Sequence, residues 1–105
     1  MATLNDALTQ VLKWIDEDFK FASSNNNVEV VDEDKIRLYT NENCYAIVAR
    51  GGERSYLGCI SSSRKPRAGE DWTRGSDLAD GDFSKETWHR IISDIVSYEL
   101  VKVHN

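Results

Sequence analysis

The chain is poor in the residues that build metal sites and disulfides. It contains two cysteines, Cys44 and Cys59, and two histidines, His89 and His104. They form no CxxC pair and no Cys/His cluster of the kind that a zinc site requires. Each cysteine falls in an expected strand, where a thiol most often behaves as a small buried hydrophobe. We therefore expect two buried cysteines, no metal site and no cofactor.

Long apolar runs are also missing. No segment approaches the roughly 20 apolar residues that span a bilayer. The N-terminal stretch MATLNDALTQ lacks the basic and then apolar pattern of a signal peptide. These absences predict a cytoplasmic protein that has no membrane partner.

Motifs for nucleotide hydrolysis or covalent catalysis are absent too. Neither GxxxxGK[ST] nor GxGxxG occurs, which gives no support to a nucleoside-triphosphatase or a dinucleotide-binding fold. The three serines at 61–63 have no histidine near them in sequence, so no nucleophile and base pair can be identified. We expect a non-enzymatic protein without catalytic residues.

The chain has fewer basic than acidic residues. The chain has 13 Lys and Arg against 18 Asp and Glu, a formal net charge of −5. Broad capture of nucleic-acid backbone or of an anionic membrane needs clustered cations, so we do not expect nucleic acid as a partner.

The residues that are present predict one α+β domain over 1–105. Apolar residues recur every three and four positions between Leu4 and Phe19, which is typical of a helix with a buried stripe. A second helix should begin at Ser84, a good N-cap residue, with Phe83 and Trp88 spaced for a hydrophobic staple. At 105 residues, the chain is long enough for a single core.

Between the two helices, the pattern is that of strands separated by turns. Alternating or apolar runs occupy 28–31, 35–40, 44–50 and 56–60, and a short alternation at 101–103 indicates a last strand. The predicted order is α-β-β-β-β-α-β, a four- to five-stranded antiparallel meander with the N-terminal and C-terminal helices packed on one face.

Three residues at seven-residue spacing flank the first apolar stripe. They are Ala7, Trp14 and Phe21. They either widen the core or form a contact between copies of the chain, because exposed aromatics mark interfaces. We expect a homo-oligomer, a dimer or higher.

The segment 61–82 is predicted to be a long functional loop, since connections of this length are uncommon in a compact domain. An arginine fork can hold a phosphate, a tryptophan face can stack on a base, and an aspartate can accept from a ribose hydroxyl or base amine. The alternative is that these charges pair with one another and keep the loop soluble. The predicted ligand-binding residues are Arg64, Lys65, Arg67, Trp72, Arg74 and Asp77.

Three sequence blocks carry a resemblance to a known group of proteins. They are YLGC at 56–59, SRKPRAGEDWTRGSDLADG at 63–81 and ETWHRIISDIVSYELVKV at 86–103. This C-terminal half resembles small accessory proteins encoded by tailed bacteriophages and prophages. The resemblance implies a protein of the host cell cytoplasm that acts by stoichiometric binding, either to a host protein or to a signal molecule of host defence.

Two functions are compatible with these observations. The first is an anti-defence protein that sequesters a phosphorylated nucleotide-like ligand through the 61–82 loop. The second is a protein–protein inhibitor or adaptor that binds a host protein through its acidic surface and the Arg/Trp loop.

Overall fold

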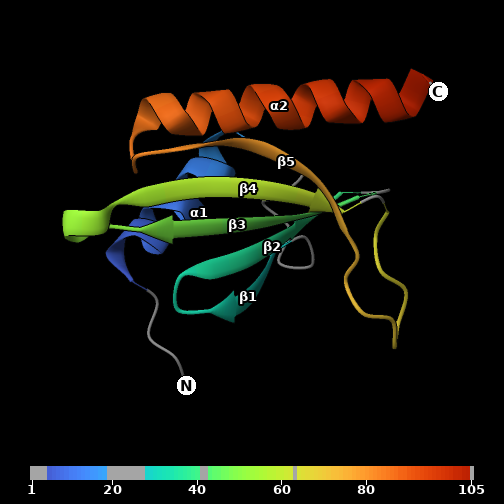
Figure 1. Ribbon diagram of the computed structural model, residues 1–105, viewed down its shortest axis with the longest axis horizontal. Helices are drawn as coiled ribbons and strands as arrows, with labels where there is room; N and C mark the ends of the chain where they lie inside the picture. The colour runs from blue at the N-terminus through green and yellow to red at the C-terminus, as the bar shows by residue number, and fades with distance from the viewer. Residues whose placement is uncertain (1–4, 19–27, 41–42, 63, 105) are drawn as a thin grey trace.

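The computed structural model describes residues 5–18, 28–40, 43–62 and 64–104. Five antiparallel strands form one sheet in the order β1-β2-β3-β4-β5, so that each strand pairs with its neighbour in sequence (Figure 1). The elements are α1 (Asp6–Asp18), β1 (Val28–Asp32), β2 (Lys35–Tyr39), β3 (Cys44–Arg50), the 3-10 turn η2 (Gly52–Arg54), β4 (Tyr56–Ser62), β5 (Arg74–Gly81) and α2 (Lys85–His104).

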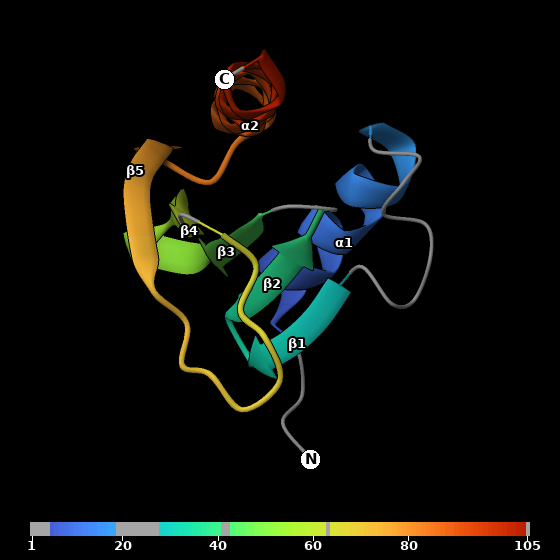
Figure 2. The same ribbon diagram turned by 90° about the vertical axis from the view of Figure 1, so that its right-hand side faces the viewer.

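Both helices lie on the same side of the curved sheet, as Figure 2 shows, and this arrangement confirms the predicted α+β meander. Strand side chains alternate between the two faces, and the apolar set of β2, β3 and β4 points to the helices. Its partners are the apolar stripes of α1 and α2. The core contains Leu8, Val11 and Ile15 of α1, Ile36 and Leu38 of β2, Tyr45, Ile47 and Ala49 of β3, Leu57 and Cys59 of β4, and Trp88, Ile91 and Ile95 of α2.

An aromatic stack joins the end of α1 to the beginning of α2. The Trp14 ring lies 5.3 Å from that of Phe83 and 5.8 Å from that of Trp88. The Trp88 Nε1 donates a hydrogen bond of 2.8 Å to Asp18 Oδ2. Trp14 therefore widens the core within the chain, while Phe21 lies outside the described residues.

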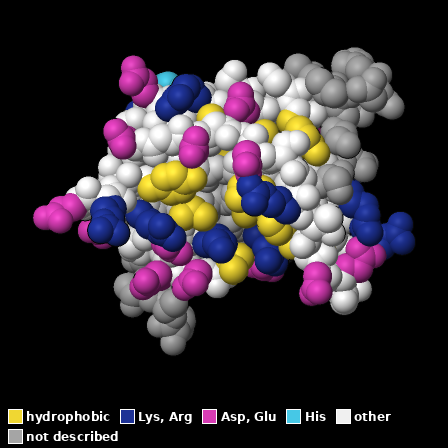
Figure 3. Space-filling model, viewed as in Figure 1, with side chains coloured by type: hydrophobic (Ala, Val, Ile, Leu, Met, Phe, Trp, Pro, Cys, Tyr) yellow, Lys and Arg dark blue, Asp and Glu magenta, His cyan; other side chains and the backbone are white. Residues whose placement is uncertain are grey.

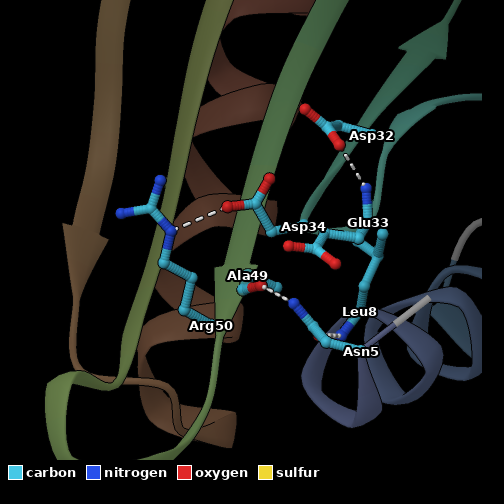
Figure 4. Close-up of polar contacts among 7 residues, drawn as sticks. All are labelled: Asn5, Leu8, Asp32, Glu33, Asp34, Ala49 and Arg50. Carbon is cyan, nitrogen blue, oxygen red and sulfur yellow. Dashed lines mark hydrogen bonds and ion pairs between the residues drawn. The ribbon is translucent and has the colours of Figure 1, made fainter. Parts of the chain in front are cut away.

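Each helix begins at a side-chain cap. Asn5 Oδ1 accepts from the backbone N–H of Leu8 at 2.7 Å, and Asn5 Nδ2 donates to the carbonyl of Ala49 at 2.9 Å, which ties α1 to β3 (Figure 4). Ser84 Oγ accepts from the N–H of Thr87 at 3.2 Å. The predicted start of the second helix is confirmed.

Two predicted boundaries are wrong. The expected loop 61–82 includes the last two residues of β4 and all of β5, and the actual connection between these strands is only 63–73. The expected strand at 101–103 is the last turn of α2. An alternation of three residues is a weak signal, and α2 continues because Ile91, Ile95 and Tyr98 pack on the sheet at helical spacing.

The cysteines are both buried and free, as predicted. Cys59 pairs with Ile47 and faces the helices, whereas Cys44 pairs with Tyr39 and faces the other side of the sheet. None of the described helices combines the length and the apolar character needed to cross a membrane.

Candidate functional site

Neither of the two described α-helices covers the sheet face opposite them, here called the open face. Figure 3 views this side and shows hydrophobic side chains surrounded by charges of both signs. Register places the members of the open face side by side. They are Lys35, Arg37 and Tyr39 of β2, Ala46, Val48 and Arg50 of β3, and Tyr56, Gly58 and Ile60 of β4.

Two bulges bring three charged residues of β5 to the open face. Gly58, Ile60 and Ser62 lie two positions apart on β4, and they pair with residues three positions apart on β5. In an unbroken strand, side chains three apart point to opposite faces, but each extra residue in a bulge resets the direction. The three residues aligned in this way are Asp80, Asp77 and Arg74.

Ser61 supports the bulge nearer Arg74. Its hydroxyl donates to the carbonyl of Ser76 at 3.2 Å and accepts from the N–H of the same residue at 3.1 Å. Ser61 is fully buried, so this exchange satisfies polar groups that the irregular ladder would otherwise leave unpaired.

A pocket of about 260 Å³ lies between β4 and β5 and opens to solvent. Its volume is slightly below the range of roughly 300 to 1,000 Å³ that is usual for small-molecule sites, so it suits a group the size of one nucleoside. The lining residues are Tyr56, Cys59, Ile60, Arg74, Asp77, Leu78 and Asp80.

The polar groups of the pocket are partly engaged with one another. The Arg74 guanidinium forms an ion pair with Asp77, and both side chains are well exposed. The Tyr56 hydroxyl donates to Asp80 Oδ2 over a long 3.4 Å. Burial raises the pKa of the Tyr56 hydroxyl, and the charge of Asp80 raises it further. The pocket thus offers a neutral phenol, a guanidinium and two carboxylates.

The Tyr56 ring lies across Gly58. A methyl group added to Gly58 would be 2.6 Å from Tyr56 Cζ and 2.9 Å from Cε1, well inside van der Waals contact. The hydroxyl end of the ring therefore lies against the strand at Gly58, and the side chain is only partly buried. A partly exposed aromatic ring of this kind can stack on a flat ligand.

The four remaining predicted residues lie on the 63–73 connection and do not line the pocket. Arg64 pairs with Glu70 at 2.8 Å, and the Lys65 ammonium lies 5.5 Å from the centre of the Tyr39 ring. Arg67 is exposed at a turn, where its carbonyl accepts from the N–H of Glu70 at 3.0 Å. The connection therefore folds back over the Tyr39 end of the open face.

Trp72 is half-buried on that same end of the open face. Its Nε1 is buried and has no hydrogen-bond partner among the described residues. It does lie near Cys44, whose pKa is raised by burial and lowered less strongly by Arg37, Tyr39 and Trp72. The thiol is therefore held in its protonated form and is not an activated nucleophile.

Two of the pocket residues, Arg74 and Asp77, were thus predicted from the sequence, and the others were missed: Tyr56, Cys59, Ile60, Leu78 and Asp80. The available signal was the spacing of three among residues 74, 77 and 80, together with a glycine two positions after Tyr56. Neither spacing indicates that these residues share a pocket until the bulged pairing of β4 with β5 is known.

A second polar cluster fastens α2 to the sheet on the helix side. Glu99 Oε1 accepts from Thr40 Oγ1 at 2.9 Å, from Asn43 Nδ2 at 3.2 Å and from the Tyr45 hydroxyl. Tyr45 and Asn43 are almost completely buried. Since the polar side chains of Thr40, Asn43 and Tyr45 all donate to the same Glu99 oxygen, we assign this cluster a structural role. Across the described ranges, no group of three or more His, Cys, Asp or Glu side chains is arranged to hold a metal ion.

Comparison of the chain with protein-family models, with curated proteins and with solved structures found no match.

Proposed function

We propose that this protein is a non-enzymatic binding protein for a phosphorylated nucleotide-like ligand, held on the open face in the pocket between β4 and β5. The observation that carries the proposal is the combination in one pocket of an aromatic ring, a guanidinium and carboxylates. These are the groups that stack on a base, bind a phosphate and accept from amines or ribose hydroxyls.

In this proposal the base stacks on the outer side of Tyr56, and the flanking apolar contacts come from Ile60 and Leu78. Arg74 binds the phosphate. Its ion pair with Asp77 leaves other N–H groups of the guanidinium available, because a planar guanidinium carries more donors than one carboxylate can accept.

The basic residues of the 63–73 connection add positive potential beside the pocket. Lys65 and Arg67 form no ion pair with any described residue, in contrast to Arg64 and Arg74. A ligand with more than one phosphate, such as a linear or cyclic dinucleotide, would reach from the pocket toward these cations.

The resemblance to tailed-phage accessory proteins supports a biological role for such a site. We propose that the protein acts in the cytoplasm of the infected host cell, as a homo-oligomer, and sequesters a nucleotide signal of host defence. Sequestration needs affinity and no chemistry, which fits a pocket in which burial raises the pKa of the lining thiol, Cys59, and keeps it protonated.

One observation favours a second candidate, a protein inhibitor or adaptor. The pocket is open to solvent, and its two carboxylates outnumber its single guanidinium. A lysine or arginine side chain of a basic host protein would satisfy this charge balance and stack on Tyr56.

The first test is a thermal-shift screen with mono-, di- and cyclic nucleotides at fixed salt, since a ligand that binds only the folded state raises the melting temperature. We expect a shift with one nucleotide class. Replacing Arg74 with Ala should weaken binding about tenfold or more, because a hydrogen bond to a charged group contributes about 1.5 to 3 kcal/mol.

Arg67→Ala is the matched control, since Arg67 is an exposed arginine outside the pocket lining. Equal losses in the two variants would place the ligand on the loop and not in the pocket. A flat screen with the wild-type protein would reject the nucleotide proposal. In that case, retention of a host protein by the wild type, and not by Tyr56→Ala, would support the second candidate.

A further inference from the structure

The Asp80 carboxylate is the acceptor of the pocket that has no ion-pair partner among the described residues. Asp77 is occupied by its ion pair with Arg74, whereas the Asp80 carboxylate has only the long contact from the Tyr56 hydroxyl. Arg90 approaches the same residue but donates to its backbone carbonyl, at 3.3 Å. Among the described residues, no cation pairs with the Asp80 side chain.

The position of this carboxylate relative to the aromatic ring is fixed by the fold. Tyr56 rests on Gly58, and Gly58 is paired directly with Asp80 across the β4–β5 ladder. The hydroxyl end of the ring points to the carboxylate. A flat group stacked on Tyr56 therefore has its edge beside Asp80.

A carboxylate that only accepts hydrogen bonds discriminates among the nucleobases. An ionised carboxylate offers two oxygens and no donor, so it binds best to two parallel N–H groups. Guanine presents such a pair, from N1–H and the 2-amino group. Adenine and cytosine place a ring nitrogen acceptor beside their amine, and uracil places its single N–H between two carbonyls, so each of these turns a lone pair toward the carboxylate.

We propose that the pocket selects a guanine nucleotide and that Asp80 accepts from the N1–H and 2-amino groups of the base. The inference rests on the proposed nucleotide-binding function and adds to it the identity of the base and the residue that reads it. Arg74 keeps its place on the phosphate, and Tyr56 is the platform on which the base stacks.

Isothermal titration with guanosine, inosine and adenosine monophosphates tests the proposal. Inosine monophosphate has the same N1–H and the same carbonyl as the guanine nucleotide and lacks only the 2-amino group. We expect its affinity to be about tenfold lower, since a bidentate contact to a base contributes about 1 to 3 kcal/mol of discrimination. Adenosine monophosphate should bind more weakly still.

Asp80→Asn should remove the difference between the guanosine and inosine nucleotides, because an amide presents a donor where the carboxylate had an acceptor. Asp82→Asn is the matched control: this aspartate is exposed, follows β5 directly and lies outside the pocket lining. It should keep the wild-type preference. Both substituted positions are exposed and the replacement is isosteric, so melting temperatures should show that both variants fold.

Equal affinity for the three nucleotides, with binding weakened about tenfold or more in Arg74→Ala, would overturn the guanine assignment and leave the nucleotide-binding function intact. A guanine preference that persists in Asp80→Asn would overturn the role of Asp80. Absence of binding by every nucleotide, in a wild-type protein shown to be folded, would reject the proposed function and this inference together.

Discussion

At the scale of single residues, Gly58 sets the shape of the pocket by having no side chain. The Tyr56 ring occupies the space that a β-carbon would need. The ring is the movable end of a side chain on the surface of the sheet, so the strand itself need not shift to accommodate a larger residue.

We therefore predict that Gly58→Ala lowers the free energy of unfolding by about 1 kcal/mol, the low end of the usual cost of overpacking, while it displaces the Tyr56 ring and abolishes nucleotide-induced stabilisation. Thermal shift with and without ligand measures both effects. Gly51→Ala is the control, because a methyl group there would meet only Ala7 Cβ at an ordinary 3.8 Å. Unchanged stabilisation in Gly58→Ala would show that the ring is not part of the site.

At the scale of elements, α2 depends on the Ser84 cap. Its first turn is fixed by the bond from the N–H of Thr87 to Ser84 Oγ, and it carries Trp88 into the core. Ser84→Ala should reduce the free energy of unfolding by about 1 kcal/mol, and Ser84→Asp should retain most of the stability because aspartate is an equally good N-cap. Urea denaturation measures both. Equal losses in the two variants would show that the cap does not account for the effect of the substitution.

The elements also differ in how far the sequence predicts them. The two helices and β2, β3 and β4 follow from periodicity, caps and turn residues. The strand β5 could not be predicted, because its two bulges replace the alternation of a regular strand with a spacing of three and because most of its residues are exposed.

The residues of the candidate site also differ in whether the sequence alone could identify them. Arg74 and Asp77 could be chosen from residue type alone, since charged and aromatic side chains in a long connection suggest recognition. Tyr56 and Asp80 could not, because they meet only through the pairing of β4 with β5. Trp72 has a suitable ring, yet the fold turns it toward Cys44 and away from the pocket.

At the scale of the whole molecule, the contact between Tyr45 and Glu99 links the helix layer to the sheet and makes stability sensitive to alkaline pH. Burial, and then the hydrogen bond and charge of Glu99, raise the pKa of the Tyr45 hydroxyl far above its ordinary value of 10.0. The folded chain therefore keeps a proton that the unfolded chain releases.

Because the pKa of Tyr45 is higher in the folded chain than in the unfolded chain, its contribution to stability is fully present below pH 10 and is lost as the pH rises above that value. Tyr45→Phe should be less stable than the wild type at pH 7 by about 1 to 2 kcal/mol, because Glu99 loses a donor, and its stability should fall less steeply above pH 10. Chemical denaturation at pH 7 and at alkaline pH measures both. Parallel losses in the two proteins would assign the alkaline effect to other groups, such as the buried Cys59 thiol.

The three tryptophans give the chain two spectroscopic signals, one from the stacked Trp14 and Trp88 and one from Trp72. Trp14 and Trp88 stack at 5.8 Å between the helices, while Trp72 lies beside Cys44 on the far side of the sheet. Indole transitions at that separation couple to each other, so near-ultraviolet circular dichroism follows the docking of α1 on α2. The part of the fluorescence change that is lost in Trp72→Phe follows the 63–73 connection. Comparison of the two proteins therefore times the order in which the two sides of the molecule assemble.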